Sequence, residues 1–198
     1  MSVKRIVFVG VGGQGNLLAS NLLGQAALAA GRQVMVSEIH GMAQRGGVVE
    51  SAVLLGGAVS PIVSEAEADI LVSFEPVEAL RALSKANRNT LVITNTRPLP
   101  PFTVAIGQAP YPSVDEAISY ISSKVGRVVA FDAQALAEEA GNPLSMNMVL
   151  LGSLMAIGKL GIPLQVMKDT IATRTKKAFL ESNLRAFDLG YNKARAAA

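Results

Sequence analysis

The chain of 198 residues contains no cysteine. It therefore cannot form a disulfide, bind zinc or an iron–sulfur cluster through thiolates, or use a cysteine nucleophile. If the protein takes part in electron transfer, another chain must carry the electrons. Histidine is scarce as well, since His40 is the only one, which leaves little material for general acid–base catalysis.

Charged residues make up only 17% of the chain, whereas half of it is apolar. Part of the surface is therefore expected to contact a partner protein. The positive charge lies near the end, where residues 168–198 hold seven Lys and Arg against three Asp and Glu. We expect Lys168, Arg174, Lys176 and Lys177 to form a solvated helix face or to contact an anion, such as a coenzyme phosphate or an acidic partner. Because no aromatic residues alternate with these charges, nucleic acid is not expected as a partner.

No hydrophobic run is long enough to cross a membrane. The longest, at residues 146–157, is interrupted by Asn147, Gly152 and Ser153 and falls short of the roughly 20 residues that a bilayer requires. The N-terminus leads directly into a strand without a cleavable leader. We therefore expect a cytoplasmic protein that does not enter a membrane.

The length suits one α/β domain that spans residues 1–198. Segments with strand character alternate with segments of helical periodicity. This pattern predicts a three-layer Rossmann-like domain with a mostly parallel, mixed sheet and a helical C-terminal segment. Strands are expected at residues 5–9, 34–38, 48–55, 69–74, 90–95 and 127–132. Helices are expected at residues 16–30, 76–85, 113–124, 133–140, 145–160, 164–173 and 176–189.

Three details of the sheet follow from local rules. The strand at residues 34–38 should lie parallel to the first strand, because crossovers are right-handed. After a Gly-Gly pair, residues 58–63 are expected to return as a short antiparallel partner of the third strand. The segment 96–112 holds five of the nine prolines, so we expect it to be looped, with an edge strand at residues 103–106.

The first strand turns into the first helix through the sequence VGVGGQGN at residues 9–16. Gly10, Gly12 and Gly15 match the spacing GxGxxG, in which glycines allow a tight turn, a close backbone approach and close helix packing. The start of the helix offers unpaired N–H groups and a partial positive charge. An anion or a carbonyl oxygen aimed at residues 13–15 would therefore be held well.

The turn by itself leaves its ligand open. Glu38 closes the second strand at about the distance where a ribose-binding carboxylate would lie, which favours a nicotinamide or flavin dinucleotide site. A purely structural turn fits equally. Gly13 and Gln14 depart from the dinucleotide pattern, because they add an amide side chain where small apolar residues are usual. Glu38 is also explained as an exposed ion-pair partner of Arg45.

A second loop reads IHGMAQRGG at residues 39–47. It has too few apolar residues for the core, and glycines stand on both sides of its polar residues. At the carboxyl end of a parallel strand it would lie beside the glycine turn, where open α/β sheets form their ligand crevice. Gln44 and Arg45 could then contact the occupant, since a planar guanidinium suits carboxylate or phosphate. His40 is either a polar loop residue or a ligand.

Three further polar residues have structural explanations. Glu75 and Glu78 flank Pro76 at the start of a helix, where the helix dipole accounts for their charge. Asn147 lies near the first turn of its helix and fits a cap or a first-turn donor. None of the three requires a catalytic role.

Four segments in order read GVGGQG at residues 10–15, EIHGMAQRGG at 38–47, FEPVEALR at 74–81 and NMVLLGSLMA at 147–156. Together they resemble the gamma subunit of 2-oxoacid:ferredoxin oxidoreductases. Within that group the loop HGMAQRGG is most similar to the small beta subunit of indolepyruvate ferredoxin oxidoreductase. The resemblance covers nearly the whole chain.

The resemblance implies a subunit that supplies no catalytic residue and binds no metal or cofactor alone. A large catalytic subunit would carry thiamine diphosphate, Mg²⁺ and iron–sulfur clusters. The 2-oxoacid would be decarboxylated there, electrons would pass to ferredoxin, and the acyl group would pass to coenzyme A. The present chain would pack against that subunit and help to shape the approach of coenzyme A.

Carried over to this sequence, the resemblance implies two sets of site residues. The residues that bind a cofactor or face the active site would be Gly10, Gly12, Gly13, Gln14, Gly15 and Glu38. The residues of the partner interface would be His40, Met42, Gln44, Arg45, Gly46 and Gly47.

Other functions stay open beside this one. The gamma subunit of a pyruvate, 2-oxoglutarate or branched-chain 2-oxoacid oxidoreductase has the same general pattern. A free-standing dinucleotide-binding module would use Gly10, Gly12, Gly15 and Glu38. A small flavin- or NAD-linked enzyme acting alone fits less well, because no acid–base pair stands beside the glycine turn.

Overall fold

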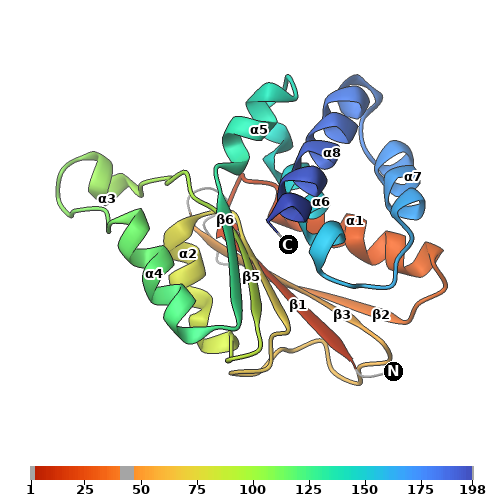
Figure 1. The fold of residues 1–198 in the computed structure, drawn as a ribbon, viewed down its shortest axis with the longest axis horizontal. Coiled ribbons are helices and arrows are strands. Elements are labelled where there is room, and N and C mark those ends of the chain that lie inside the picture. The colour runs from red at the N-terminus through yellow and green to blue at the C-terminus, as the bar shows by residue number, and fades with distance from the viewer. Residues whose placement is uncertain (1–2, 41–46, 198) are drawn as a thin grey trace.

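A computed structural model describes residues 3–40 and 47–197 of the chain. It shows a mixed six-stranded sheet with the strand order β2-β3-β1-β4-β5-β6 (Figure 1). The strands are β1 Lys4–Val11, β2 Val34–His40, β3 Val48–Leu55, β4 Ile70–Ser73, β5 Leu91–Asn95 and β6 Arg127–Phe131. The four strands β1, β4, β5 and β6 are mutually parallel, whereas β3 is antiparallel to both of its neighbours. The predicted α/β class with a mixed sheet is confirmed.

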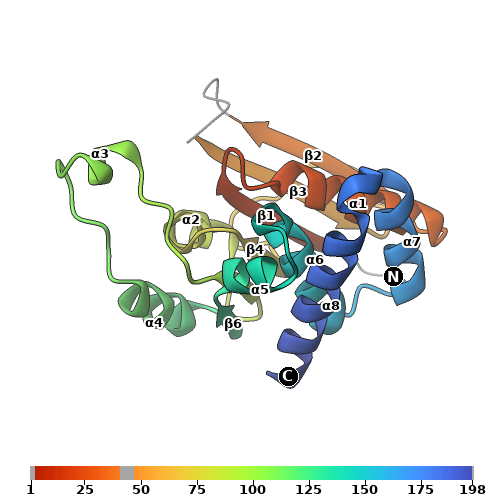
Figure 2. The ribbon, with the colours of Figure 1, turned by 90° about the horizontal axis from the view of Figure 1, so that it is seen from above.

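Helices cover both faces of the sheet (Figures 1 and 2). They are α1 Asn16–Ala29, α2 Pro76–Arg81, α3 Phe102–Ala105, α4 Val114–Lys124, α5 Ala133–Glu139, α6 Met146–Ile157, α7 Leu164–Arg174 and α8 Leu180–Ala196, with short 3-10 turns at Ala82–Lys85, Pro143–Ser145 and Lys177–Phe179. Helices α1, α5, α6, α7 and α8 pack on one face, and α2 and α4 on the other. The three-layer arrangement and the helical C-terminal segment match the sequence prediction.

The alternation of side chains along β1 explains the two cores. Ile6 and Phe8 point to the face that α1 and the C-terminal helices cover, whereas Val7 and Val9 point to the face that α2 and α4 cover. All four are buried, as expected for a central strand that is enclosed on both sides.

Two glycines let α6 and α8 approach each other closely. A Cβ atom on Gly152 would lie 2.0 Å from the carbonyl oxygen of Phe187, and one on Gly190 would lie 1.9 Å from the carbonyl oxygen of Val149. Next to this contact the Ser153 hydroxyl donates to the Gly190 carbonyl at 2.9 Å. The segment NMVLLGSLMA therefore forms a helix that is buried in the core and not a helix that is exposed on the surface.

One detail of the predicted sheet is wrong, and a second is confirmed in direction, although another strand lies between the two strands concerned. Residues 58–63 form no strand, and β3 pairs instead with β1 and β2, with Leu55 opposite both Lys4 and Val34. Strand β2 thus runs in the same direction as β1 but is not its neighbour. The reason is that β3 follows β2 in the chain as an antiparallel hairpin partner and takes the place between β2 and β1. The buried, apolar end of β3 suits a central position.

Another difference concerns residues 103–106, which were expected to form an edge strand. Residues 103–105 belong to the short helix α3 and Ile106 is its C-cap, with its N–H donating to the Phe102 carbonyl at 3.0 Å. Pro101 precedes the helix with a φ of −66° and a ψ of 162°, a conformation that suits a helix start. Among residues 3–40 and 47–197, no helix is both long enough and apolar enough to span a bilayer.

Candidate functional site

The glycine turn lies at the carboxyl end of β1, where α1 begins. Gly13 and Gly15 have φ angles of +108° and +84°, which side chains other than glycine rarely adopt. Gly15 is the N-cap of α1, and no side chain caps this helix. Gly13 is exposed, and no described residue apart from its chain neighbours lies within 4 Å of the position that a Cβ atom on it would take. The turn is therefore a left-handed backbone structure that is open on its outer side.

Gln14 braces the turn from inside. Its Oε1 atom accepts a hydrogen bond from the Val11 N–H at 2.8 Å, and its Nε2 atom donates to the Phe74 carbonyl at 3.2 Å. A Cβ atom on Gly10 would lie 2.9 Å from the Cβ of Phe74, so the glycine is needed for this close approach. The amide that departs from the dinucleotide pattern thus links the turn to the end of β4.

Asn147 holds the turn from the opposite side. Its Nδ2 atom donates to the Gly15 carbonyl at 3.4 Å, and its Oδ1 atom accepts from the Met148 N–H at 2.9 Å. A Cβ atom on Gly15 would lie 2.6 Å from that Nδ2. Three of the segments that carry the family resemblance, at residues 10–15, 74–81 and 147–156, therefore meet at one place.

The fourth segment reaches the same place through Gly47. The Gly12 N–H donates to the Gly47 carbonyl at 2.8 Å, so the predicted neighbourhood of the two glycine loops is confirmed at these residues. Met42, Gln44, Arg45 and Gly46 lie outside the described residues. His40 ends β2 opposite Val49.

Glu38 lies away from the turn. Its backbone faces Ser51 of β3, and β3 separates its strand from β1. The exposed carboxylate accepts a hydrogen bond from the Asn21 side chain of α1 at 2.9 Å. This arrangement gives no support to a ribose contact, which needs the acidic residue on the strand next to the glycine turn.

A cavity of about 440 Å³ opens beside the turn. Its lining combines the turn with the ends of β5, α5 and α6, and it includes Gly13, Gln14, Gly15, Asn95, Arg97, Gln134 and Asn147. Leu18, Leu99 and Leu144 also line it, with 42%, 46% and 76% of their surfaces exposed. A crevice at the carboxyl ends of parallel strands is the usual ligand or partner site of open α/β sheets, and this one has an apolar rim.

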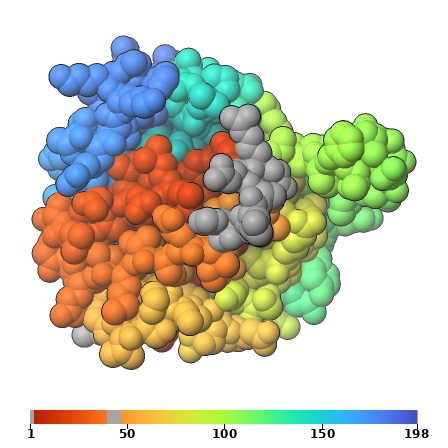
Figure 3. Space-filling model, turned by 180° about the vertical axis from the view of Figure 1, so that it is seen from behind, coloured from red at the N-terminus to blue at the C-terminus, as the bar shows by residue number. Residues whose placement is uncertain are grey.

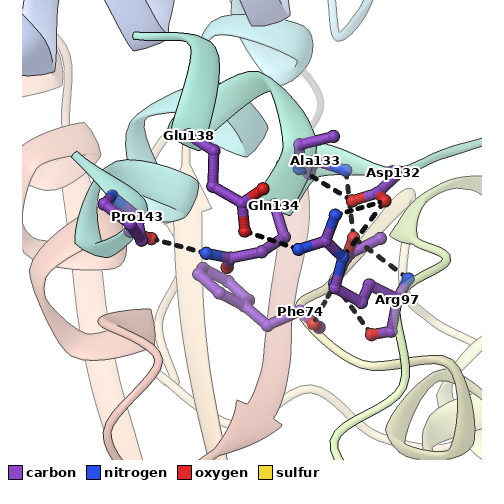
Figure 4. A network of polar contacts seen from close by, with 9 residues as sticks. Phe74, Arg97, Asp132, Ala133, Gln134, Glu138 and Pro143 are labelled. Atoms are coloured by element: carbon purple, nitrogen blue, oxygen red, sulfur yellow. Dashed lines mark hydrogen bonds and ion pairs between the residues drawn. The ribbon is translucent and has the colours of Figure 1, made fainter. Parts of the chain in front are cut away.

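Arg97 lies in the wall of this cavity, but its guanidinium is already paired (Figure 4). Its Nε and Nη2 atoms donate to Asp132 at 3.1 and 2.9 Å, and its Nη1 atom donates to Glu138. Hydrogen bonds to these two carboxylates raise the pKa of Arg97. Asp132 is also the N-cap of α5. Arg97 therefore fixes the cavity wall rather than offering a vacant anion site.

Glu75 is a second buried residue that links several segments. From the sequence, only the helix dipole explained its charge. Its Oε2 atom accepts from the N–H groups of Val77 and Glu78 at 2.7 and 3.1 Å, which makes it the N-cap of α2. Its Oε1 atom accepts from the Leu99 N–H at 3.3 Å and from the Tyr111 hydroxyl. Burial and this contact raise the pKa of Tyr111.

Through these contacts Glu75 joins both ends of residues 98–112, which we call the arm. No local pattern reveals the link, because Glu75 and Tyr111 are 36 positions apart. Asn16 was missed for the same reason, since its buried side chain donates to the carbonyls of Phe8 and Val49. The only signal for Asn16 in the sequence is its position at the start of the helix, between a glycine and a leucine.

The basic residues Arg174, Lys176 and Lys177 near the end of the chain are exposed, as the sequence predicted for a solvated face. Lys168 of α7 pairs with Asp188 of α8 at 2.6 Å. Within the described ranges, 3–40 and 47–197, no group of three or more His, Cys, Asp or Glu side chains could hold a metal ion.

A sequence model of the family described as pyruvate ferredoxin/flavodoxin oxidoreductase matches residues 5–193. The chain is 44% identical over 197 residues to the indolepyruvate oxidoreductase subunit IorB of Pyrococcus horikoshii, with 98% of each chain covered. It is 41% identical to IorB of Archaeoglobus fulgidus, with 96% of this chain and 94% of that one covered.

Solved structures share the fold. The gamma subunit of a keto/oxoacid ferredoxin oxidoreductase from Geobacter sulfurreducens matches with a TM-score of 0.72 and 22% identity, over 98% of this chain and 99% of that one. The 2-oxoglutarate:ferredoxin oxidoreductase of Magnetococcus marinus matches with a TM-score of 0.74 and 20% identity, over 99% of this chain and 32% of that one.

Proposed function

The chain belongs to the pyruvate ferredoxin/flavodoxin oxidoreductase family, and from this we propose that it acts as the small subunit of an indolepyruvate-type 2-oxoacid:ferredoxin oxidoreductase. The observation that carries the proposal is the identity of 44% along 98% of both chains to an indolepyruvate oxidoreductase subunit. The gamma-subunit fold agrees with it.

The division of work is the one that the family resemblance implies, and the composition of the chain agrees with it. Thiamine diphosphate with Mg²⁺ would supply the decarboxylation, iron–sulfur clusters would pass electrons to ferredoxin, and coenzyme A would accept the acyl group. The chain has no cysteine for a cluster. We therefore assign these groups to the large subunit and expect the small subunit to be inactive alone.

The proposed contact surface is the crevice edge of the sheet, which carries the backbone of Gly12, Gly13 and Gly47. Their neighbours Leu99 and Leu144 expose 46% and 76% of their surfaces, which costs free energy unless another protein covers them. We propose that the large subunit packs here. Residues 13–15 would then line the approach of coenzyme A, because the positive end of α1 suits its phosphates.

The turn is held in one conformation, so the interface would serve to position groups of the large subunit. Gln14 and Asn147 hold it from two sides, so its backbone presents a fixed surface. A surface that needs no rearrangement loses little entropy when a partner binds. This fits a subunit that shapes the active site without supplying a reacting group.

Co-expression with the large subunit tests the proposal. The chain should purify in a complex with a larger protein that contains thiamine diphosphate and iron–sulfur clusters, and indolepyruvate should be oxidised faster than pyruvate or 2-oxoglutarate. A chain that purifies alone under these conditions would refute the subunit role. A complex that prefers pyruvate would refute only the substrate class.

The alternative of a free-standing dinucleotide-binding module has less support, since Glu38 is separated from the glycine turn by β3. Calorimetric titration of the isolated chain with NAD(H), NADP(H) and FAD distinguishes the two functions. Tight binding of one of them without a partner would favour the module.

A further inference from the structure

A second cavity, of about 680 Å³, lies between the arm, the start of α2 and the two glycine loops. The residues of its lining that matter here are Gly12, Gly47, Glu78, Arg81, Phe102 and Tyr111. Gly12 and Gly47 place it on the same edge of the sheet as the proposed contact surface.

Glu78 lines this cavity, and one of its carboxylate oxygens has no hydrogen-bond partner among the described residues. The Glu78 side chain is only 5% exposed, and its Oε1 atom accepts a hydrogen bond from Arg81. Its Oε2 atom is buried and makes no hydrogen bond with any described residue. Burial raises the pKa of Glu78, against the attraction of Arg81 and with the repulsion of Glu75. A buried acceptor without a hydrogen bond costs free energy, and a donor that reaches it removes this cost.

The neighbouring charged groups do not supply a hydrogen-bond donor to Oε2 of Glu78. Glu75 is itself an acceptor, and both of its oxygens are already bonded. The Arg81 side chain is 57% exposed and approaches only Oε1. Two carboxylates and one guanidinium thus belong to the lining of this cavity, although the chain as a whole carries a net charge of +3. The cavity is locally acidic and calls for a cation with N–H groups.

The walls of the cavity suit the side chain of such a cation. Four prolines of the arm, together with Phe102 and Tyr111, line the same cavity as Glu78. Aromatic faces attract ammonium and guanidinium groups, and apolar walls accommodate the methylene stem of Lys or Arg. Apolar walls that lead to one carboxylate fit a long basic side chain, whose stem would contact the walls and whose charged end would reach the carboxylate.

The arm also indicates where that side chain comes from. It stands out from the body of the molecule and carries α3 (Figures 1 and 3). None of the residues of α3 is buried, and Phe102 and Ile106 expose 76% and 47% of their surfaces. An apolar projection of this kind is typical of a surface that a partner protein covers.

We propose that this cavity receives a basic side chain of the large subunit, whose N–H groups donate to Oε2 of Glu78. The inference rests on the proposed function and adds the chemistry of one contact to it. The large subunit would cover the arm, and its basic side chain would donate the hydrogen bond that Glu78 lacks.

Subunit affinity measured with Glu78→Gln tests the proposal. The amide keeps the size of the side chain but removes the charge, so we expect the affinity for the large subunit to fall at least tenfold. The isolated variant should unfold at the same temperature as the wild type or higher, because a buried charge is removed. Glu67→Gln is the matched control, since it removes a carboxylate paired with Arg5 near the opposite end of β1, and its affinity should stay within twofold.

A second variant avoids the buried position. Phe102→Ala shortens an exposed wall residue and should weaken binding without changing the unfolding temperature. Methylguanidinium chloride should compete with the large subunit for the wild-type chain more strongly than sodium chloride of equal concentration, and this difference should vanish in Glu78→Gln.

The outcomes separate this inference from the proposed function. If the wild-type chain binds no large subunit, both fail. If the complex forms but neither variant weakens it, only the inference fails. It also fails if Glu78→Gln lowers affinity and unfolding temperature together, which would indicate a structural role, or if methylguanidinium binds the isolated chain through Glu78 while subunit affinity is unaffected.

Discussion

Replacing Glu75 with Gln tests the link between the sheet and the arm. The carboxylate accepts four hydrogen bonds, from the N–H groups of Val77, Glu78 and Leu99 and from the Tyr111 hydroxyl. An amide has only one acceptor oxygen. If that oxygen caps α2, its NH₂ group faces the arm, where the Tyr111 hydroxyl can reverse and accept but the Leu99 N–H loses its partner.

The magnitude follows from this count. A lost hydrogen bond to a charged acceptor costs about 1.5–3 kcal/mol, so we expect Glu75→Gln to lower the free energy of unfolding by about 2 kcal/mol. For a chain of this size that corresponds to a decrease in Tm of about 4–8 °C. Tyr111→Phe removes one hydrogen bond to the same charged acceptor and leaves the cap intact, so it should cost about 1.5–3 kcal/mol.

Two measurements check the reasoning. Urea denaturation gives the free energy of unfolding, and hydrogen–deuterium exchange reports the arm locally. The Leu99 amide should exchange faster in Glu75→Gln than in the wild type, while the amides of β1 should not differ. If the Leu99 amide keeps its protection, or if the variant is as stable as the wild type, Glu75 does not hold the arm.

Three further outcomes are expected. Gly152→Ala places a Cβ 2.0 Å from the Phe187 carbonyl oxygen, so urea denaturation should show a net loss of about 2 kcal/mol despite the better helix propensity of alanine. Because the pKa of Glu78 is raised above its ordinary value of 4.5, the native state holds this proton to higher pH than the unfolded state. The stability of the isolated chain should therefore decrease as pH rises above 4.5, and Glu78→Gln should remove that part of the decrease. Leu144→Asp should weaken subunit association at least tenfold, whereas Leu28→Asp, on an exposed leucine at the far end of α1, should not.

Most strands and helices could be predicted from the sequence because they depend on local signals, the exceptions being residues 58–63 and the helix α3. Hydrophobic runs marked the strands, and glycine, proline and capping residues marked the boundaries. The order of the strands could not. Which strand pairs with which depends on contacts between distant segments, and the hairpin that inserts β3 between β1 and β2 has no signature within either strand.

The candidate site shows the same division. The contact between the two glycine loops could be predicted, because both follow strand ends at one edge of the sheet, and the bond between Gly12 and Gly47 confirms it. The inward role of Gln14 and the four bonds of Glu75 could not, since their partners lie on other elements. The assignment of the glycine loops to a partner interface stays a prediction.

Reconstitution of activity tests the central claim most directly. Ferredoxin reduction by indolepyruvate and coenzyme A should be measured with the purified chain, with the large subunit, and with both together. The chain alone should give no reduction, the large subunit alone at most a tenth of the combined rate, and the mixture full activity at equimolar ratio. Reduction by the chain alone, or full activity of the large subunit without it, would contradict the account.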